Sequence, residues 1–399
     1  TTAYVLTGSD GTCSRSDTVV VSVSGTIQPP VSGTLRYDNT SQTPMTNTTV
    51  RLLAGGSQIT SVITNATGDF NFGPVPPGAY TLQYQTNKPW GGVNSVDALN
   101  ITRHFSVVQP LSGLRLRVAD VNNSNTVSAT DALQVNQRFS FLRSSFTAGD
   151  WAYSLNTLTV PNDPTPIVLS GRALCSGDVN GSYSPNVNLR ERWEDLALSG
   201  EVFTGEGEYT VNVQLSSALN VGAVSLVLRV PAGMEVLGIT TGLGSSDEVV
   251  FNQIGNVVRI AWHTLQQWDV EQGGVLLRIR ARGAADGVFA LGAHESELAN
   301  SWADVYGSFD LRTPRLVGSS VNYTGLSVYP NPSTAIFRVS SETAMQELVV
   351  RDMSGRAVLR SLPVAGTSEL DLSAQRDGVY MLEVRLSDRT EQIRLVLRR

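Results

Sequence analysis

The sequence has 399 residues, a formal net charge of −6 and only 16% charged residues. A chain of this length divides into about three or four domains of ~100 to 150 residues each. Its negative charge argues against a general attraction to nucleic acid. Low charge with abundant Gly, Ser, Thr, Asn and Val is typical of extracellular β-sandwiches rather than of helical or cytosolic enzymes.

A few sequence features restrict the chemistry that the chain can perform and the place where it can work. Lys88 is the only lysine among 29 basic residues, which excludes lysine-based Schiff-base or Walker-type chemistry nearly everywhere. No apolar run reaches the ~18 residues of a membrane span. No signal peptide opens the chain, and we expect these residues to be the tail of a longer protein. Cys13 and Cys175 leave two alternatives open, a disulfide between them or two thiols that are unpaired or paired elsewhere.

The first 85 residues are rich in β-strand signals. Residues 1–25 contain two β-rich runs around the turn-like Ser9-Asp10-Gly11-Thr12, which we interpret as the closing hairpin of an immunoglobulin-like repeat. Residues 26–85 begin with a Pro-containing linker and continue as short alternating strands, which predicts a small β-sandwich. The Gly-Asp-Phe and Val-Pro-Pro-Gly-Ala-Tyr runs at 68–70 and 75–80 resemble the prealbumin-like or carboxypeptidase-regulatory-like module.

A nine-residue segment occurs twice in the next region, 86–200. Asp97–Phe105 and Asp131–Phe139 share Asp, Ala, Leu and Phe at matching positions, 34 residues apart. Such repeats usually mark duplicated supersecondary units that pack on each other. We predict helices near 95–105 and 130–139, with Phe105 and Phe139 each buried against the partner unit.

The second copy opens with a loop of regularly spaced oxygens. Counting Asp120 as position 1, side-chain oxygens fall at positions 3 (Asn122), 5 (Ser124), 9 (Ser128) and 12 (Asp131). Position 7 (Thr126) offers its backbone carbonyl. A hard cation such as Ca²⁺ takes about six to eight oxygens, which a loop of this spacing can supply. The alternative is a polar turn with Asp131 near a helix start and no metal.

This paired loop-helix repeat resembles the dockerin family, which implies two Ca²⁺-binding units that often hold a cohesin partner. The upstream loop departs from the pattern, because Thr86, Lys88 and Trp90 stand at its positions 1, 3 and 5. An ammonium group cannot ligate calcium, which takes oxygen ligands. The first copy therefore supplies only Asp97, the closing half of a site.

A third fragment carries the missing opening half. Asp178, Asn180 and Ser182 repeat positions 1, 3 and 5, but Leu189 stands at position 12. We hypothesise that the halves combine, so that Asp97 and these three residues share one ion. Because Ca²⁺ lies about 2.4 Å from its oxygens, Asp97 must then lie within about 8 Å of Asp178.

Period-two alternation dominates residues 201–323. One predicted strand face carries Tyr209, Val211, Val213 and Leu215. The strand order and the Gly-Gly-Val-Leu-Leu-Arg-Ile strand entry at 273–279 resemble a cohesin-type β-sandwich. This resemblance implies binding of a loop-helix partner, either within the chain at high effective concentration or in another molecule.

Residues 324–399 carry three motifs in order. These are Tyr329-Pro330-Asn331-Pro332, Asp352-Met353-Ser354-Gly355-Arg356 and Gly378-Val379-Tyr380. Together they resemble the type A C-terminal sorting domain of the type 9 secretion system. In physical terms they are strands joined by turns, and one strand face carries Tyr380, Leu382, Val384 and Leu386.

That resemblance implies export across the outer membrane of a Bacteroidetes-like bacterium. The partners it implies are the type 9 translocon and its outer-membrane shuttle barrel, and the location is secreted or cell surface. We expect Arg398 and Arg399 to contribute to recognition. We also expect deletion of residues 395–399 to leave the protein in the periplasm.

Catalytic motifs are missing from the sequence. The three histidines, His104, His263 and His294, are scattered, and no HExxH, Gly-x-Ser-x-Gly, phosphate-loop or CxxC pattern occurs. We therefore expect these residues to have no enzyme activity.

The predicted fold class is mainly β, with tandem β-sandwich domains and one small α-helical dockerin-like calcium-binding module. The predicted domains are 1–25, 26–85, 86–200, 201–323 and 324–399. The predicted function is that of a noncatalytic C-terminal region of a large secreted or cell-surface protein, adhesive or structural, that is stiffened by Ca²⁺. The alternative is the accessory tail of a secreted polysaccharide- or protein-degrading enzyme whose catalytic domain lies upstream.

Overall fold

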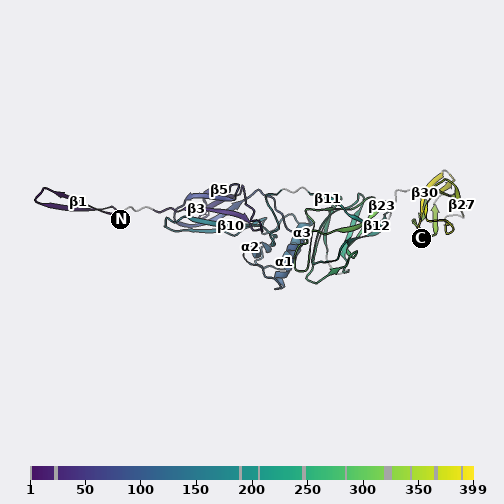
Figure 1. Ribbon diagram of the computed structural model, residues 1–399, viewed down its shortest axis with the longest axis horizontal. Helices are drawn as coiled ribbons and strands as arrows, with labels where there is room; N and C mark the ends of the chain where they lie inside the picture. The colour runs from purple at the N-terminus through teal and green to yellow at the C-terminus, as the bar shows by residue number, and fades with distance from the viewer. Residues whose placement is uncertain are drawn as a thin grey trace. The chain divides into compact units, whose positions relative to one another are not determined.

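The computed structural model describes residues 2–21, 26–187, 191–204, 207–244, 249–283, 285–318, 326–341, 344–363, 367–387 and 390–399. The chain divides into two units, Thr1–Val317 and Gly318–Arg399. The described chain has many more strands than helices, and the strands form several sheets (Figure 1). The mainly-β fold class is therefore confirmed. None of the helices in the described ranges is long and apolar enough to cross a membrane.

The first element is an antiparallel hairpin of β1 (Thr2–Ser9) and β2 (Ser14–Val21). Its turn is held by the Asp10 carboxylate, which accepts hydrogen bonds from the amides of Thr12 and Cys13. All described residues of the hairpin are exposed. The predicted hairpin is present, and its assignment to an immunoglobulin-like repeat stays a prediction.

The first sandwich consists of two four-stranded sheets. One sheet contains β6 (Asp69–Pro74), β3 (Pro30–Tyr37), β10 (Ile167–Cys175) and β8 (Trp151–Tyr153), and the other contains β5 (Ser57–Ile63), β4 (Thr49–Ala54), β7 (Gly78–Gln85) and β9 (Thr157–Val160). Alternate residues of β3, namely Val31, Leu35 and Tyr37, are fully buried, as the period of a strand requires.

The predicted boundary at residue 85 is wrong, because the first sandwich is completed by strands that follow the helices. β10 pairs in parallel with β3, with Leu35 opposite Gly171, and β9 pairs with β7. Pairing over more than a hundred residues leaves no trace in local alternation, so the sequence pattern missed it. The helices are thus an insertion within one sandwich.

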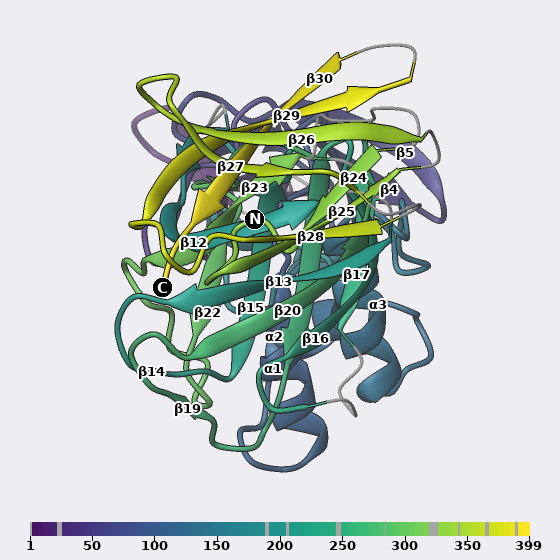
Figure 2. The ribbon, with the colours of Figure 1, turned by 90° about the vertical axis from the view of Figure 1, so that its right-hand side faces the viewer.

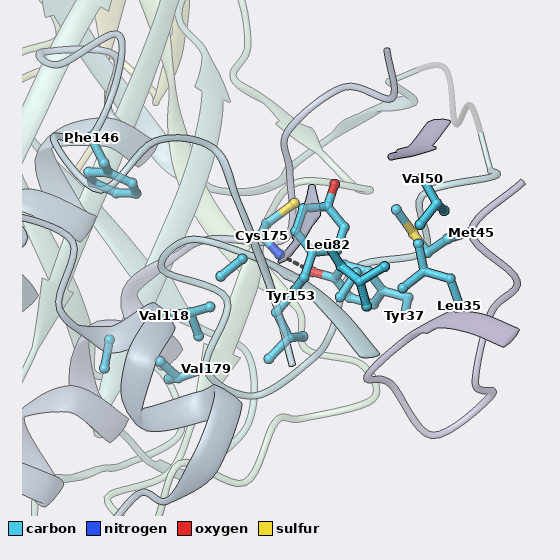
Figure 3. Packing of buried hydrophobic residues seen from close by; sticks show 14 of the residues in the cluster. Leu35, Tyr37, Met45, Val50, Leu82, Val118, Phe146, Tyr153, Cys175 and Val179 are labelled. Atoms are coloured by element: carbon cyan, nitrogen blue, oxygen red, sulfur yellow. Dashed lines mark hydrogen bonds between the residues drawn. The ribbon is translucent and has the colours of Figure 1, made fainter. Parts of the chain in front are cut away.

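The helical module comprises α1 (Ser95–Phe105), α2 (Gly113–Ala119) and α3 (Ala129–Phe139). Both predicted helices are present, whereas α2 was not predicted. Asn94 and Ser128 cap α1 and α3, and each forms a reciprocal capping box with the aspartate three residues later. The module shares one apolar core with the first sandwich, which runs from Met45 and Leu35 through Tyr37 to Val118 and Phe146 (Figure 3).

The two repeat-equivalent phenylalanines have different environments. Phe139 is buried, but it packs on Val227 and Ala261 of the second sandwich instead of on the partner helix unit. Phe105 is 55% exposed, so the prediction of its burial is wrong. The repeat correctly placed both residues at helix ends, but of the two only Phe139 is buried against another module.

The second sandwich has a six-stranded and a five-stranded sheet, with a small β14–β19 ribbon beside them. The first sheet contains β11 (Trp193–Asp195), β21 (Ala290–Gly292), β15 (Ala223–Arg229), β18 (Val257–His263), β17 (Val250–Ile254) and β22 (Glu297–Ala299). The second contains β12 (Ala197–Thr204), β23 (Leu311–Gly318), β13 (Glu208–Leu215), β20 (Val275–Arg282) and β16 (Glu235–Thr241), and the ribbon joins β14 (Leu219–Asn220) to β19 (Asp269–Val270).

The predicted inward face of β13 is confirmed, because Val211, Val213 and Leu215 are fully buried. The predicted start at residue 201 is too late, since β11 begins at Trp193 and β12 at Ala197. β11 is only three residues long, which is too short to show alternation. The predicted end at 323 lies outside the described residues.

The second unit is a C-terminal sandwich of a three-stranded and a four-stranded sheet. The three-stranded sheet contains β24 (Leu326–Tyr329), β25 (Ile336–Ser341) and β28 (Thr367–Asp371). The four-stranded sheet contains β27 (Ala357–Ser361), β26 (Met345–Asp352), β29 (Gly378–Leu386) and β30 (Thr390–Leu397). β26, β29 and β30 run side by side in Figure 2. The predicted buried face of β29, from Tyr380 to Leu386, is confirmed.

The two cysteines do not form a disulfide with each other. Cys13 is free and exposed on the hairpin, whereas Cys175 is free and buried at the end of β10. Burial raises the pKa of the Cys175 thiol, which disfavours its reactive thiolate form.

Candidate functional site

The contiguous loop, Asp120–Asp131, curls its polar side chains around one point. The Asp120 carboxylate accepts hydrogen bonds from the amides of Ser124 at 2.9 Å and Asn125 at 2.7 Å. The Asp131 carboxylate closes the loop by accepting from the amide of Asn122 at 3.3 Å. The Ser124 hydroxyl donates to the Thr126 carbonyl at 3.0 Å. Asp120, Asn122, Ser124, Thr126 and Asp131 therefore belong to one closed loop.

Left-handed backbone makes this closure possible. Asn123 has φ of 58° and Asn125 has φ of 66°. Asparagine tolerates this conformation better than most residues with a side chain. The two residues alternate with the inward-facing Asn122 and Ser124, so the chain reverses direction while side-chain oxygens at alternate positions stay on the inside.

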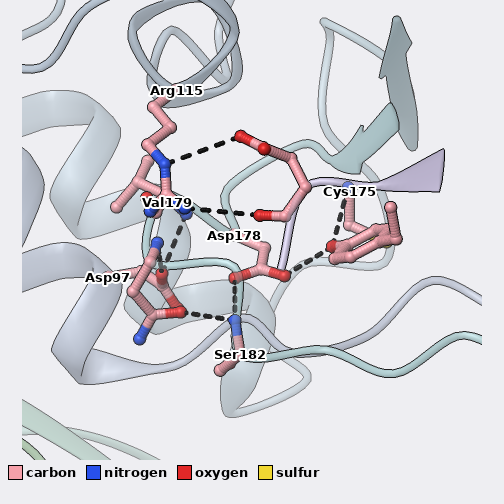
Figure 4. A network of polar contacts seen from close by, with 9 residues as sticks. Asp97, Arg115, Cys175, Asp178, Val179 and Ser182 are labelled. Atoms are coloured by element: carbon pink, nitrogen blue, oxygen red, sulfur yellow. Dashed lines mark hydrogen bonds and ion pairs between the residues drawn. The ribbon is translucent and has the colours of Figure 1, made fainter. Parts of the chain in front are cut away.

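The split loop is formed by Asp178, Asn180 and Ser182 together with Asp97, which lies at the start of α1 (Figure 4). Asp97 accepts hydrogen bonds from the amides of Val179 at 2.9 Å and Asn180 at 3.1 Å. Asp178 accepts from the amide of Ser182 at 3.0 Å. The structure thus brings together the two half-sites that lie about eighty residues apart in the sequence.

The split loop repeats the contiguous loop bond by bond. The amide of Ser182 donates to Asp178 and to Asn180, as the amide of Ser124 does to Asp120 and to Asn122. The Asn180 amide donates to Asp97, as the Asn122 amide does to Asp131.

One member of the split loop was missed by the sequence analysis. The Ser182 hydroxyl donates to the Gly92 carbonyl at 3.0 Å, which matches the bond from Ser124 to Thr126. Gly92 lies 34 residues before Thr126, so the repeat spacing carried the signal. Gly92 also has a φ of 80°, and a Cβ there would lie 2.5 Å from the Cβ of Tyr183.

The replaced upstream segment takes no part in the split loop. Lys88, which occupies its position 3, instead donates hydrogen bonds to the side chains of Thr46 and Asn186. Leu189, which occupies position 12 of the downstream fragment, lies outside the described residues. Asp97 takes that closing position in the structure.

Buried negative charge gathers at the split loop. Asp97 and Asp178 are both fully buried. Burial, and next the charge of Asp178, raise the pKa of Asp97 well above its ordinary value. Burial also raises the pKa of Asp178, although the Tyr37 hydroxyl donates a hydrogen bond to it. Arg115 lies nearby, but its guanidinium contacts the Val179 carbonyl and Asp38.

Both loops have the donor chemistry of a hard-cation site. Each offers two carboxylates, one amide oxygen, one hydroxyl and one backbone carbonyl, which are the oxygen ligands that Ca²⁺ takes. Within the described ranges no group of three or more His, Cys, Asp or Glu side chains gathers around a common point. This donor set fits calcium and lacks the imidazole and thiolate ligands that zinc prefers.

The helical module packs on the outer face of the second sandwich. β15 is buried on both faces: Val224, Leu226 and Leu228 face the sandwich core, whereas Ala223 and Val227 contact the helical module. On the side of the helices, Val96 and Leu99 of α1 complete the contact with Ala223.

Polar bonds fix the register of this interface. The Ser95 amide donates to the Ser225 hydroxyl at 2.8 Å, and the Trp262 amide donates to the Ser95 hydroxyl at 3.1 Å. Asn94 donates a hydrogen bond from its side chain to Glu297. Because these groups are buried, an unpaired partner would cost about 1–3 kcal/mol, so the interface specifies one arrangement.

His263 lies between the two repeated helices, a role that the sequence analysis did not identify. Its Nε2 is 2.9 Å from the Thr102 hydroxyl, and its Nδ1 is 3.1 Å from the Asn136 amide nitrogen. Thr102 and Asn136 are repeat-equivalent, 34 residues apart. Thr102 donates to the Ala98 carbonyl, so we assign the ring proton to Nε2. Burial lowers the pKa of His263 to about 4, which favours the neutral ring.

Acidification should therefore weaken this interface. Neutral His263 stabilises the fold above its unfolded pKa near 6.5, and that stability is lost as pH falls toward about 4. By pH 5 the expected loss is about 2 kcal/mol. The measurement is the urea midpoint of wild type and His263→Gln between pH 7.5 and 5. Equal pH dependence in both proteins would contradict the assignment, because all carboxylates are common to them.

The three C-terminal motifs act as structural ties within their sandwich. The side-chain nitrogen of Asn331 donates to the Arg394 carbonyl at 2.6 Å, and the backbone amide of Val396 donates to the side-chain oxygen of Asn331 at 2.8 Å. Tyr329, Pro330 and Pro332 flank this bond at the end of β24. Tyr380, two residues after Gly378, donates its hydroxyl to the Arg376 carbonyl at 2.6 Å.

The Asp352 turn and the chain end are held in a similar way. Asp352 accepts from the amide of Arg356 at 3.1 Å and pairs with its guanidinium, and Gly355 supplies the left-handed residue between them, with φ of 86°. The Arg399 guanidinium donates to the Gln375 carbonyl at 2.9 Å, and the Arg398 amide donates to the Ser333 carbonyl at 2.9 Å.

Comparison with known proteins identifies two segments. Residues 91–140 match the dockerin type I domain, and residues 327–398 match the secretion system C-terminal sorting domain. The dockerin match includes Asp97 and the contiguous loop but ends before Asp178. No curated protein matches the chain.

Several solved structures are distantly similar. A non-cellulosomal cohesin from Archaeoglobus fulgidus is 18% identical and covers 32% of this chain and 94% of its own, with a TM-score of 0.25. The BcpA major pilin subunit of Bacillus cereus is 8% identical over 92% of this chain and 95% of its own, with a TM-score of 0.27. The SpaD major pilin of Corynebacterium diphtheriae is 8% identical over 93% and 92%, with a TM-score of 0.26.

TM-scores this low do not establish a shared fold, and the sandwiches described above are defined by their own strand order.

The sorting domain directs the chain through the type 9 secretion system to the cell surface or the extracellular space. The chain therefore contains a segment that matches the dockerin type I domain, at residues 91–140, and a segment that matches the secretion system C-terminal sorting domain, at residues 327–398.

Proposed function

We propose that this chain is a noncatalytic, calcium-stiffened region of an adhesive or structural surface protein. In this proposal one Ca²⁺ binds the contiguous loop through Asp120, Asn122, Ser124, Asp131 and the Thr126 carbonyl. A second binds the split loop through Asp97, Asp178, Asn180, Ser182 and the Gly92 carbonyl. When bound, each ion supplies positive charge that offsets the paired carboxylates.

The observation that carries this proposal is the position of the split loop. Its opening half follows β10 of the first sandwich, and its closing half begins α1 of the helical module. The same first turn of α1 contacts the second sandwich through Ser95. An ion held there would join all three parts, which suits a load-bearing surface region better than a site for turnover.

Docking within the chain is part of the proposed role. The dockerin-type segment lies on the second sandwich through the Ser95 and His263 contacts described above, which favours an intramolecular partner over a cohesin in another molecule. A pull-down of the wild-type chain with separate cohesin and dockerin proteins, with and without chelator, tests this choice. Strong capture in Ca²⁺ would favour the intermolecular alternative.

The rival function is the accessory tail of a secreted polysaccharide- or protein-degrading enzyme. The sequence and mass of the intact secreted protein distinguish the two functions. Further sandwich repeats attached to this chain would support the structural role, whereas an attached catalytic domain would support the rival. An assay of the purified chain against polysaccharide and protein substrates tests the absence of activity directly.

Recognition by the secretion machinery can be separated from folding. Leu395 and Leu397 are buried in β30, so deletion of residues 395–399 would also damage the sandwich. Arg398→Ala is a cleaner change, because among the described residues only the backbone of Arg398 is hydrogen-bonded into the fold. We expect it to lower the secreted fraction while the melting temperature is unchanged. Arg394→Ala, which replaces an exposed arginine of β30, is the control, and equal secretion of all three proteins would contradict the role of Arg398.

A further inference from the structure

The first turn of α1 connects the split loop to the second sandwich. The Asn94 amide donates to the Asp97 carboxylate at 3.0 Å, on the oxygen opposite the one that contacts Val179 and Asn180. The Asn94 side chain accepts from the Val96 amide at 2.8 Å and donates to Glu297 of β22. One residue thus contacts both a proposed ligand of the split loop and the neighbouring module.

Glu297 is an unusual residue for an interface. It is partly buried, and in the described structure it forms no ion pair with arginine or lysine; its hydrogen-bond partner is the neutral Asn94 amide. Burial raises the pKa of Glu297, and the charge of Glu297 contributes to the raised pKa of Asp97. The charges of Asp178 and Glu297 therefore both act on Asp97, and Asn94 links Asp97 to Glu297.

A cation at the split loop would reverse the sign of this interaction. Without an ion, the Glu297 charge opposes docking because it repels the buried carboxylate of Asp97. With a divalent ion, the same charge is attracted to the loop, and its bond to Asn94 holds the capping residue in place. Docking then raises the cation affinity of the split loop, and cation binding stabilises docking by the same coupling free energy.

We propose that Glu297 is a positioning residue for the split loop, supplied by the second sandwich and acting through Asn94. Cation binding at the split loop and docking of the helical module then strengthen each other. This inference rests on the proposed function of the split loop as a calcium site. It adds that the site is complete only when the second sandwich is docked, which the contiguous loop does not require.

The test is a Ca²⁺ titration of the full chain by calorimetry, with one loop disabled at a time. In an Asp120→Asn background the split loop is measured, and in an Asp178→Asn background the contiguous loop is measured. Glu297→Gln keeps an oxygen that can accept from Asn94 but removes the charge. We expect it to lower the affinity of the split loop about fivefold and to leave the contiguous loop unchanged.

A matched control removes an equal charge two residues away. Glu295 is exposed and forms an ion pair with Arg259, so Glu295→Gln should leave the affinity of the split loop unchanged. Hydrogen exchange at the Trp262 amide, which donates to Ser95, reports docking independently. Ca²⁺ should slow this exchange in the wild type, and more weakly in Glu297→Gln.

The results distinguish a failure of the Glu297 coupling from a failure of the split calcium site itself. If Ca²⁺ binds in the Asp120→Asn background with equal affinity whether residue 297 is Glu or Gln, the coupling is wrong and the split calcium site stands. If no Ca²⁺ binds in that background, the split site itself is wrong. Equal losses from Glu295→Gln and Glu297→Gln would reduce the effect to general electrostatics and overturn the role of Glu297.

Discussion

Saturating Ca²⁺ is expected to stabilise the first unit by about 4 kcal/mol for each occupied loop, when free Ca²⁺ exceeds the dissociation constant about a thousandfold. The physical reason is the buried pair Asp97 and Asp178, which no described arginine or lysine neutralises. The contiguous loop, with Asp131 also fully buried, should contribute similarly. The measurement is the thermal unfolding transition in Ca²⁺ and in EGTA.

Replacement of one ligand should give opposite effects in the two conditions. In EGTA, Asp178→Asn removes a buried charge that repels Asp97, so we expect equal or higher stability than in the wild type. In Ca²⁺ the same change removes a carboxylate ligand, so most of the stabilisation from the split loop should be lost. Asp17→Asn, on the exposed hairpin, is the control and should change neither condition.

The calcium interpretation has a clear failing result. If Asp178→Asn lowered stability by the same amount in EGTA and in Ca²⁺, the aspartate would be acting only as a polar turn residue that accepts from Ser182. That result would restore the alternative reading of these loops as metal-free turns and helix caps.

Phe139→Ala is expected to destabilise the docked state by about 3 kcal/mol, as is typical for truncation of a buried phenylalanine. Phe139 fills the contact with Val227 and Ala261, and the Arg259 guanidinium lies 5.6 Å from its ring. The cavity would lie between two modules, so undocking rather than global unfolding should be the first effect. Hydrogen exchange at the β18 amides and the urea midpoint both measure it.

The repeat provides a matched control for this prediction. Phe105 occupies the equivalent position of α1 but is 55% exposed, so Phe105→Ala should cost less than about 1 kcal/mol. Similar losses from the two substitutions would mean that the end of α3 does not contribute to docking. A loss confined to Phe139 would support the packing of α3 on the second sandwich.

Local patterns in the sequence predicted local structure well. The inward faces of β13 and β29 follow from period-two alternation, because one face of each strand packs on a core and the other meets solvent. The helices near 95–105 and 130–139 were predicted from the nine-residue repeat, and in the structure Asn94 and Ser128 cap them through free amides of the first turn. These features depend on neighbours within a few residues.

Features that depend on distant neighbours were harder to predict. β15 is buried on both faces, and Ala223, Ser225 and Val227 contact the helices. The sequence of β15 alone does not predict which part of the chain covers its outer face. His263 has a role only because α1 and α3 enclose it. The split loop was the exception, since the repeated Asp-x-Asn-x-Ser spacing at 178–182 marked an opening half whose closing partner could be sought elsewhere.

The parallel pairing of β3 with β10 has a consequence for the order of folding. Closing a chain segment of more than a hundred residues costs conformational entropy that grows with the logarithm of its length. The inserted helices shorten this search, because Asp97 on α1 contacts the residues that directly follow β10. The helical insertion should therefore form first and deliver the last strand to its neighbours, so an ion that assembles the split loop early would also speed completion of the first sandwich.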